Sequence, residues 1–224
     1  MLVVEGGSIT YGDGLLNLKD AWPYYVDENA VNLALKGKSP DHIEMSLLSY
    51  YYTQSKFDEC IIAWPSVIRK CLFKADTREY IDFNAIGLFS DYYKDDRFVR
   101  EFYKKYYCQF ESLKTHWLRC LKLIAWFKQH NIRWMMINQD RVEQEIYNGD
   151  KSLSPWFHNT NDEQIKKIIS DLQILEAEIL KNSNYVLFKD YFMSGYQKNS
   201  DDHPSKEEHK IIGNHIKGLW DGMH

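Results

Sequence analysis

Short apolar segments alternate with helical patterns along this chain, and that alternation limits the fold more than any other feature. Strands are predicted at residues 2–5, 30–35, 60–64 and 133–138. Helices are predicted at residues 43–53, 97–130, 162–181 and from about 205 onward, with a short helix within 15–29. Alternating strands and helices favour parallel sheets, because each helical crossover returns the chain to the same edge. We therefore expect an α/β fold: a three-layer α/β/α sandwich with a mostly parallel, flavodoxin-like sheet.

The segment 97–130 carries the strongest helical period. Its apolar residues recur at steps of three and four: Phe98, Phe102, Tyr106, Phe110, Leu113, Trp117, Leu121, Ile124 and Phe127. This spacing predicts one long amphipathic helix whose aromatic stripe packs in the core rather than stacking on bases or a cofactor. In the last helix, Ser205 and Glu208 have the spacing of a capping box, which fixes where that helix begins.

Charge and hydropathy exclude two classes of partner. The 224 residues include 28 Lys and Arg against 32 Asp and Glu, a net charge of −4, whereas nucleic-acid binding normally needs a basic excess. No uncharged apolar run approaches the roughly 18 residues of a membrane span, and no export signal is evident. We expect one domain over residues 1–224, cytoplasmic or otherwise soluble, with loop or lid segments near 87–96 and 140–161.

Cysteine and histidine spacing gives no metal or disulfide pattern. Cys60, Cys71, Cys108 and Cys120 are 11, 37 and 12 residues apart, which matches neither a CxxC pair nor zinc knuckles, so buried reduced thiols are expected. Only His209 and His215 come near ligand spacing, and six residues do not place them on one helical face. Neither a metal nor a cofactor is predicted.

The predicted topology brings several reactive groups to one rim. Ser8, Gly37, residues 64–66 and Asn138 each follow or end a predicted strand. In open parallel sheets, the loops at the carboxyl ends of the strands form the reactive edge. We expect these residues to share that edge.

Ser8 and His203 are the candidate catalytic pair. Ser8 follows a strand and two glycines, where a tight turn exposes a hydroxyl, and His203 stands beside Asp201 and Asp202 before the last helix. Taken alone, the Ser8 segment is typical of an ordinary turn, and the His203 segment is typical of a solvated helix cap. Together they supply the hydroxyl, imidazole and carboxylate of acyl-transfer catalysis.

Three segments resemble the motif blocks of the SGNH hydrolases, the GDSL-type esterase and lipase superfamily. Residues 6–12 (Gly-Gly-Ser-Ile-Thr-Tyr-Gly) are similar to the first block, with glycine at position 7 in place of the usual aspartate. Residues 32–39 are similar to the second block, and residues 201–205 to the last, which contains a His-Pro pair.

This resemblance implies roles for particular residues. Ser8 would be the nucleophile and His203 the base, and the backbone N–H groups of Ser8 and Gly37 would hold the oxyanion. The family's acid stands three residues before the histidine, but that position is Ser200 here. We therefore prefer Asp201 as the acid and keep Asp202 as the alternative.

The third block of the family is missing. It normally supplies an asparagine after the third strand, whereas residues 60–66 contain none. A third oxyanion donor would then come from Ser66, the Trp64 indole, Arg69 or Asn138. Losing one such donor costs about 10²–10³ in kcat.

The resemblance implies a serine ester hydrolase that forms an acyl-enzyme, possibly acting on O-acetylated carbohydrate or short acyl esters. Lipid and thioester hydrolysis stay open. So do two alternatives: a weak or inactive SGNH-fold module that binds carbohydrate or has a structural role, and an acyltransferase. The expected partner is a small-molecule or carbohydrate ester.

Overall fold

A computed structural model describes residues 1–67, 69–74, 79–83, 98, 101–102, 109–138, 162–187 and 203–223. Its main sheet has the strand order β2-β1-β3-β6-β7, and every neighbouring pair is parallel. The strands are β1 (Leu2–Gly6), β2 (Val31–Asn32), β3 (Glu59–Trp64), β6 (Arg133–Asn138) and β7 (Tyr185–Leu187). The expected parallel α/β architecture is confirmed.

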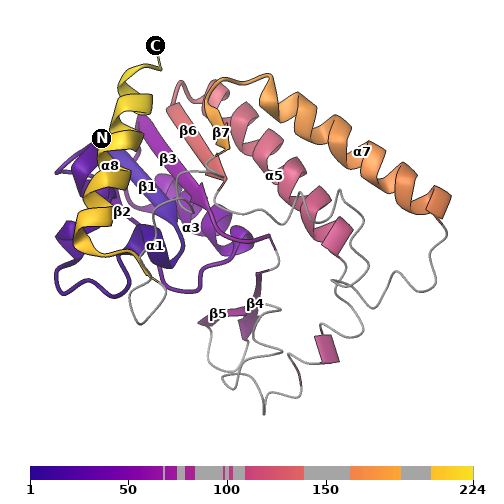
Figure 1. The fold of residues 1–224 in the computed structure, drawn as a ribbon, viewed down its shortest axis with the longest axis horizontal. Coiled ribbons are helices and arrows are strands. Elements are labelled where there is room, and N and C mark those ends of the chain that lie inside the picture. Colours follow the sequence, from indigo (N-terminus) through magenta and orange to yellow (C-terminus); the bar gives the residue numbers. More distant parts are fainter. Residues whose placement is uncertain are drawn as a thin grey trace.

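Helices cover both faces of this sheet (Figure 1). They are α1 (Ser8–Tyr11), η1 (Leu18–Asp20), α2 (Pro23–Val26), α3 (Pro40–Thr53), α5 (Gln109–Gln129), α7 (Asp162–Leu180) and α8 (Lys206–Asp221). Because strand side chains alternate between faces, neighbouring residues of β1 enter different cores. Val3 packs with residues of α3, α5 and α7, whereas Leu2 and Val4 pack with residues of α2 and α8. The result is three layers, with one hydrophobic core on each face.

A two-stranded antiparallel hairpin lies apart from the main sheet. It consists of β4 (Lys70–Lys74) and β5 (Glu79–Phe83), and it was not expected from the sequence. Its strands are rich in charged residues, so they lack the apolar run that marks a buried strand. Strand β4 of the hairpin packs against α3, one of the helices that cover the main sheet.

Most predicted elements are present with small shifts of their ends. The predicted strand at residues 30–35 shortens to β2. The Asn32 side chain donates to Thr10 O at 2.9 Å and accepts from the Ala34 N–H at 3.1 Å, while the Leu33 and Leu35 N–H groups still donate to Val4 O and Gly6 O of β1. The aromatic segment is helical as α5, and Phe98 and residues 101–102 are helical too. Residues 103–108 lie outside the described part, as do the predicted loops at 87–96 and 140–161.

The capping box of the last helix is confirmed. The Glu208 N–H donates to Ser205 Oγ at 3.3 Å, and the Ser205 N–H donates to Glu208 Oε2 at 2.6 Å. Cys60 and Cys120 are buried as expected, Cys71 is half-buried, and none of the three is in a disulfide. No helix among the described residues is long and apolar enough to cross a membrane.

Candidate functional site

The Ser8 turn joins the end of β1 to the start of α1. Ser8 is partly exposed and is the first residue of α1. Its carbonyl accepts hydrogen bonds from the N–H groups of Gly12 and Asp13, both at 3.0 Å. A Cβ on Gly6 would lie 2.3 Å from Thr10 Oγ1, so only glycine permits this close strand-to-helix turn. The turn holds the serine at the carboxyl edge of the sheet, as predicted.

The loop that carries Gly37 runs along the end of β1. The Leu33 N–H donates to Val4 O at 2.9 Å, and the Leu35 N–H donates to Gly6 O at 3.4 Å. Gly37 has φ of +75°, a conformation that favours glycine, and no described atom lies within 4 Å of the position its Cβ would take. The backbone of this loop therefore lies at the same edge as Ser8, with open space at Gly37.

The imidazole of His203 reaches the segment that follows Ser8. His203 Nε2 lies 3.7 Å from Asp13 Oδ2, and Asp13 also pairs with Lys36 from the Gly37 loop. The sequence analysis did not select Asp13, although the run Gly12-Asp13-Gly14 so soon after Ser8 could have drawn attention to it. The predicted acids, Asp201 and Asp202, lie outside the described residues. Asp13 therefore connects these segments: its N–H donates to Ser8 O, and its carboxylate pairs with Lys36 and with His203.

The candidate third oxyanion donors have different surroundings. Trp64 is fully buried, and its ring centroid lies 5.0 Å from that of His116 in an edge-on contact. Asn138 is 1% exposed, and Ser66 is half-buried. Arg69 lies beside the Ser8 turn, because its Nη1 is 3.3 Å from the position that a Cβ on Gly7 would take. A Cβ at position 7 would therefore lie close to the end of the Arg69 side chain, and the glycine leaves that space open.

A buried ion pair supports the turn from inside. Glu5 and Lys38 are 0% and 1% exposed, and Lys38 Nζ donates to Glu5 Oε1 at 2.8 Å, Glu5 Oε2 at 3.0 Å and Leu33 O at 2.9 Å. Burial raises the pKa of Glu5 to about 7, against the opposing effect of Lys38. Lys38 follows Gly37 directly, so the pair fastens the Gly37 loop to β1.

His209 has a structural position below the last turn. It is fully buried, and its Nδ1 accepts the Trp22 N–H at 3.2 Å, as expected for a histidine that packs beneath the site. Burial lowers the pKa of His209 to about 4, so it is neutral at neutral pH.

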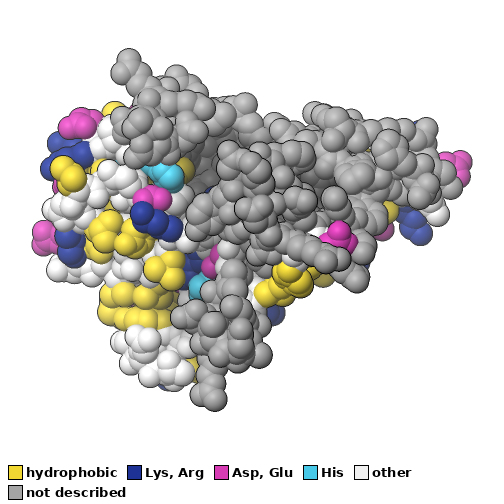
Figure 2. All heavy atoms as spheres, turned by 90° about the horizontal axis from the view of Figure 1, so that it is seen from below, with side chains coloured by type: hydrophobic (Ala, Val, Ile, Leu, Met, Phe, Trp, Pro, Cys, Tyr) yellow, Lys and Arg dark blue, Asp and Glu magenta, His cyan; other side chains and the backbone are white. Residues whose placement is uncertain are grey.

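The surface at this edge is mixed in character. Figure 2 looks at the molecule from below the view of Figure 1 and shows basic, acidic, histidine and apolar side chains interspersed on this face. One group of described residues, His42, Cys71 and Asp82, brings metal-ligand side chains together, and it includes none of the residues of the Ser8 turn. The spacing of these residues in the sequence gave no sign of this group.

Comparisons with known proteins rest on the fold. No family model and no curated protein matches the sequence. A solved structure assigned to the G-D-S-L family of lipolytic proteins, from Desulfitobacterium hafniense, is similar over 97% of this chain and 98% of its own, with a TM-score of 0.51 and 15% identity. A structure assigned as an acylhydrolase, from Bacteroides fragilis, is similar over 98% of this chain and 86% of its own, with a TM-score of 0.51 and 12% identity.

A third solved structure is a carbohydrate esterase whose active site is described as having divergent catalytic and non-catalytic binding functions. It is similar over 98% of this chain and 66% of its own, with a TM-score of 0.50 and 14% identity. At such low identity these likenesses establish the fold alone. The chain therefore has the fold of the SGNH, or G-D-S-L, hydrolases.

Proposed function

We propose that this protein is a serine ester hydrolase that works through a covalent acyl-enzyme. The observation that carries the proposal is the placement of Ser8 on a strand-to-helix turn, with the His203 imidazole held beside the segment that follows it. A partly exposed serine with an imidazole nearby is the core of nucleophilic acyl transfer.

The reaction has two steps. Ser8 Oγ attacks the ester carbonyl while His203 takes the serine proton, and the tetrahedral oxyanion forms. His203 then protonates the leaving alcohol, which leaves an ester on Ser8. Water, activated by His203, attacks this acyl-enzyme and releases the acid. The serine proton leaves with the alcohol through His203, and one proton of the attacking water returns to Ser8, so each cycle consumes one ester and one water.

Two kinds of carboxylate serve His203 in this proposal. Asp201, with Asp202 as the alternative, is the acid of the triad, whose role is to fix the tautomer of the imidazole. Asp13 lies 3.7 Å from Nε2, and its charge stabilises the imidazolium that forms when the serine proton is transferred. Lys36 holds the Asp13 carboxylate in place.

The oxyanion site consists of the Ser8 and Gly37 N–H groups and a third donor. We assign the third position to Arg69, with Ser66 and Asn138 as alternatives, because Arg69 Nη1 lies 3.3 Å from the position that a Cβ on Gly7, next to Ser8, would take. A guanidinium offers several donors and a fixed positive charge, which suits a developing oxyanion.

We propose short acyl esters as substrates, with O-acetyl groups on carbohydrate as the preferred class. The carbohydrate esterase neighbour supports this choice through the shared fold.

The test is turnover of p-nitrophenyl acetate and acetylated sugars by the purified chain, Ser8→Ala and His203→Ala, with Ser55→Ala as an exposed-serine control. Both site variants should lose hydrolysis by at least about 10³-fold, while Ser55→Ala retains the wild-type rate. Equal rates for wild type and Ser8→Ala would show that the activity does not depend on this serine.

A non-catalytic carbohydrate-binding module is the second candidate. It is favoured by the lack of the third-block asparagine and by the position of Asp13 next to His203 Nε2, the nitrogen that usually faces the serine. Glycan binding without turnover, unchanged in Ser8→Ala, would support it. Product analysis with a competing sugar alcohol separates the third alternative, acyl transfer, from hydrolysis.

A further inference from the structure

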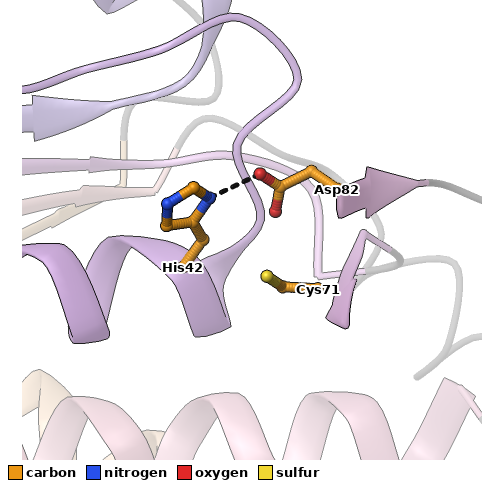
Figure 3. Close-up of side chains that lie close together, drawn as sticks. All are labelled: His42, Cys71 and Asp82. Atoms are coloured by element: carbon orange, nitrogen blue, oxygen red, sulfur yellow. Dashed lines mark hydrogen bonds and ion pairs between the residues drawn. The ribbon is translucent and has the colours of Figure 1, made fainter. Parts of the chain in front are cut away.

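Three side chains of different chemistry meet where the β4–β5 hairpin approaches the first turn of α3 (Figure 3). They are His42 of α3, Cys71 of β4 and Asp82 of β5, all half-buried, and their ligand atoms lie within 4.8 Å of one another. Within the described part of the chain, no other group of three or more His, Cys, Asp or Glu side chains converges in this way.

The fold fixes two of these side chains on one face of the hairpin. Cys71 and Asp82 are direct partners in the antiparallel ladder, so their side chains project from the same face. Figure 3 shows the Cys71 sulfur directed toward the Asp82 carboxylate. The close approach of thiol and carboxylate therefore follows from strand register rather than from flexible loops.

The start of α3 orients the third side chain. Ser39 is the N-cap of this helix, and its Oγ accepts the His42 N–H at 3.3 Å. The Ser39 N–H donates to Asp82 Oδ1 at 2.9 Å, and His42 Nδ1 lies 2.6 Å from Asp82 Oδ2. A backbone donor thus holds one carboxylate oxygen while the other faces the imidazole, which is the kind of outer contact that orients metal ligands.

The neighbouring acids of α3 have cationic partners of their own. Asp41 pairs with Arg119, and Glu44 pairs with Arg119 and Lys122. A divalent cation would offset the electrostatic cost of a thiolate beside a carboxylate.

We propose that His42, Cys71 and Asp82 bind a divalent transition metal of the Zn²⁺ class through one imidazole nitrogen, one thiolate sulfur and one carboxylate oxygen. This donor set suits Zn²⁺ and Co²⁺ rather than Mg²⁺ or Ca²⁺, which take oxygen ligands alone. Water completes a tetrahedral shell. The thiol proton passes to solvent as the metal binds.

The three donors are close to the required geometry. In a tetrahedral zinc site they would stand roughly 3–4 Å apart, given metal–ligand lengths of about 2.0–2.3 Å. Metal binding therefore asks the His42–Asp82 contact to open slightly and the thiol to approach. Bound metal would tie the hairpin to His42 in the first turn of α3, whose N-cap Ser39 lies two residues after Gly37.

The test is titration of Co²⁺ into the full chain after treatment with a chelator. We expect one equivalent to bind, with a thiolate-to-cobalt charge-transfer absorption and the intense visible bands of tetrahedral Co²⁺, and Zn²⁺ should displace it. Cys71→Ser, His42→Ala and Asp82→Asn should each weaken binding by at least about 100-fold, more than loss of an outer contact costs. Far-ultraviolet circular dichroism checks that the variants fold.

The matched control is Cys120→Ala, which removes a buried thiol 3.7 Å from His116 Nε2 and should leave cobalt binding unchanged. Cobalt that binds without a thiolate band, or equally well to wild type and Asp82→Asn, would overturn the proposal. Asp82→Asn keeps the side-chain shape, so it decides the result even where Cys71→Ser fails to fold. None of these readouts depends on esterase activity.

Discussion

Glu5, three residues before Ser8, forms a buried ion pair with Lys38. Lys38 donates to both carboxylate oxygens of Glu5, and burial raises the pKa of Glu5 to about 7. Because this folded pKa exceeds the unfolded value, the native state holds the proton more tightly between about pH 4.5 and 7. The contribution of Glu5 to stability therefore falls as the pH rises through that window.

Lys38→Met should destabilise the protein more at high pH than at low pH. At pH 8 the variant leaves the Glu5 carboxylate buried without its partner, and the free energy of unfolding should fall by about 3–5 kcal/mol. At pH 5 Glu5 is protonated and needs no counter-charge, so the loss should be smaller. Urea unfolding at both pH values, with the exposed Lys210→Met as control, measures this. An equal loss at pH 5 and pH 8 would contradict the assigned role of the pair.

Arg69 is the residue whose catalytic role the sequence left open and the structure makes testable. Its Nη1 lies next to Gly7, immediately before the proposed nucleophile. If it is the third oxyanion donor, Arg69→Ala should lower kcat by about 10²–10³ with little change in KM, because the contact forms in the transition state. Added guanidinium should restore part of the rate. A raised KM with unchanged kcat would instead assign Arg69 to substrate binding.

At the scale of elements, the site depends on how closely α2 and α8 pack. A Cβ on Gly213 of α8 would lie 2.5 Å from Tyr25 Cβ and 2.7 Å from Trp22 O of the α2 region. This close approach lets α8 carry His209 to the Trp22 N–H and holds the turn containing His203. The helix pair therefore depends on a glycine that helix propensity alone would not favour.

Gly213→Ala should lower the free energy of unfolding by about 1–3 kcal/mol, because α2 and α8 must move apart to admit the methyl group. Gly218→Ala, in the same helix, is the matched control. Among the described residues no atom lies within 4 Å of a Cβ at Gly218, so this change should raise stability by about 0.5–1 kcal/mol. Urea unfolding of both variants decides the matter, and equal effects would contradict the packing argument.

Elements with a strong local signal were predictable, and weak ones were not. β1, β3 and β6 are apolar runs, and α8 begins at a capping box, so pattern alone located them. β7 has three residues, and the hairpin strands carry charged side chains, so neither had a pattern that separates a strand from a loop. The predicted strand at residues 30–35 was too long, because the ladder with β1 pairs Val31 and Asn32, and the chain beyond them keeps single hydrogen bonds to β1.

At the scale of the whole molecule, the candidate site contains residues that the sequence predicted and residues that only the tertiary structure brings in. Ser8 and Gly37 follow strands, and His203 precedes a capped helix, so each stands at a landmark visible in the sequence. Asp13 and Arg69 reach the site through packing of separate segments, and His42, Cys71 and Asp82 meet only because the hairpin folds onto α3. Such contacts depend on tertiary arrangement, which residue spacing does not encode.

The shared fold does not by itself establish an enzyme, since one fold supports many functions. The central claim is that Ser8 is an activated nucleophile. The most direct measurement is the intact mass of the protein after incubation with a small fluorophosphonate, compared with Ser8→Ala and His203→Ala. We expect a single adduct on wild type that peptide mapping places on Ser8 and that both variants lack. An unlabelled wild type, under conditions that label a control serine esterase, would contradict the claim.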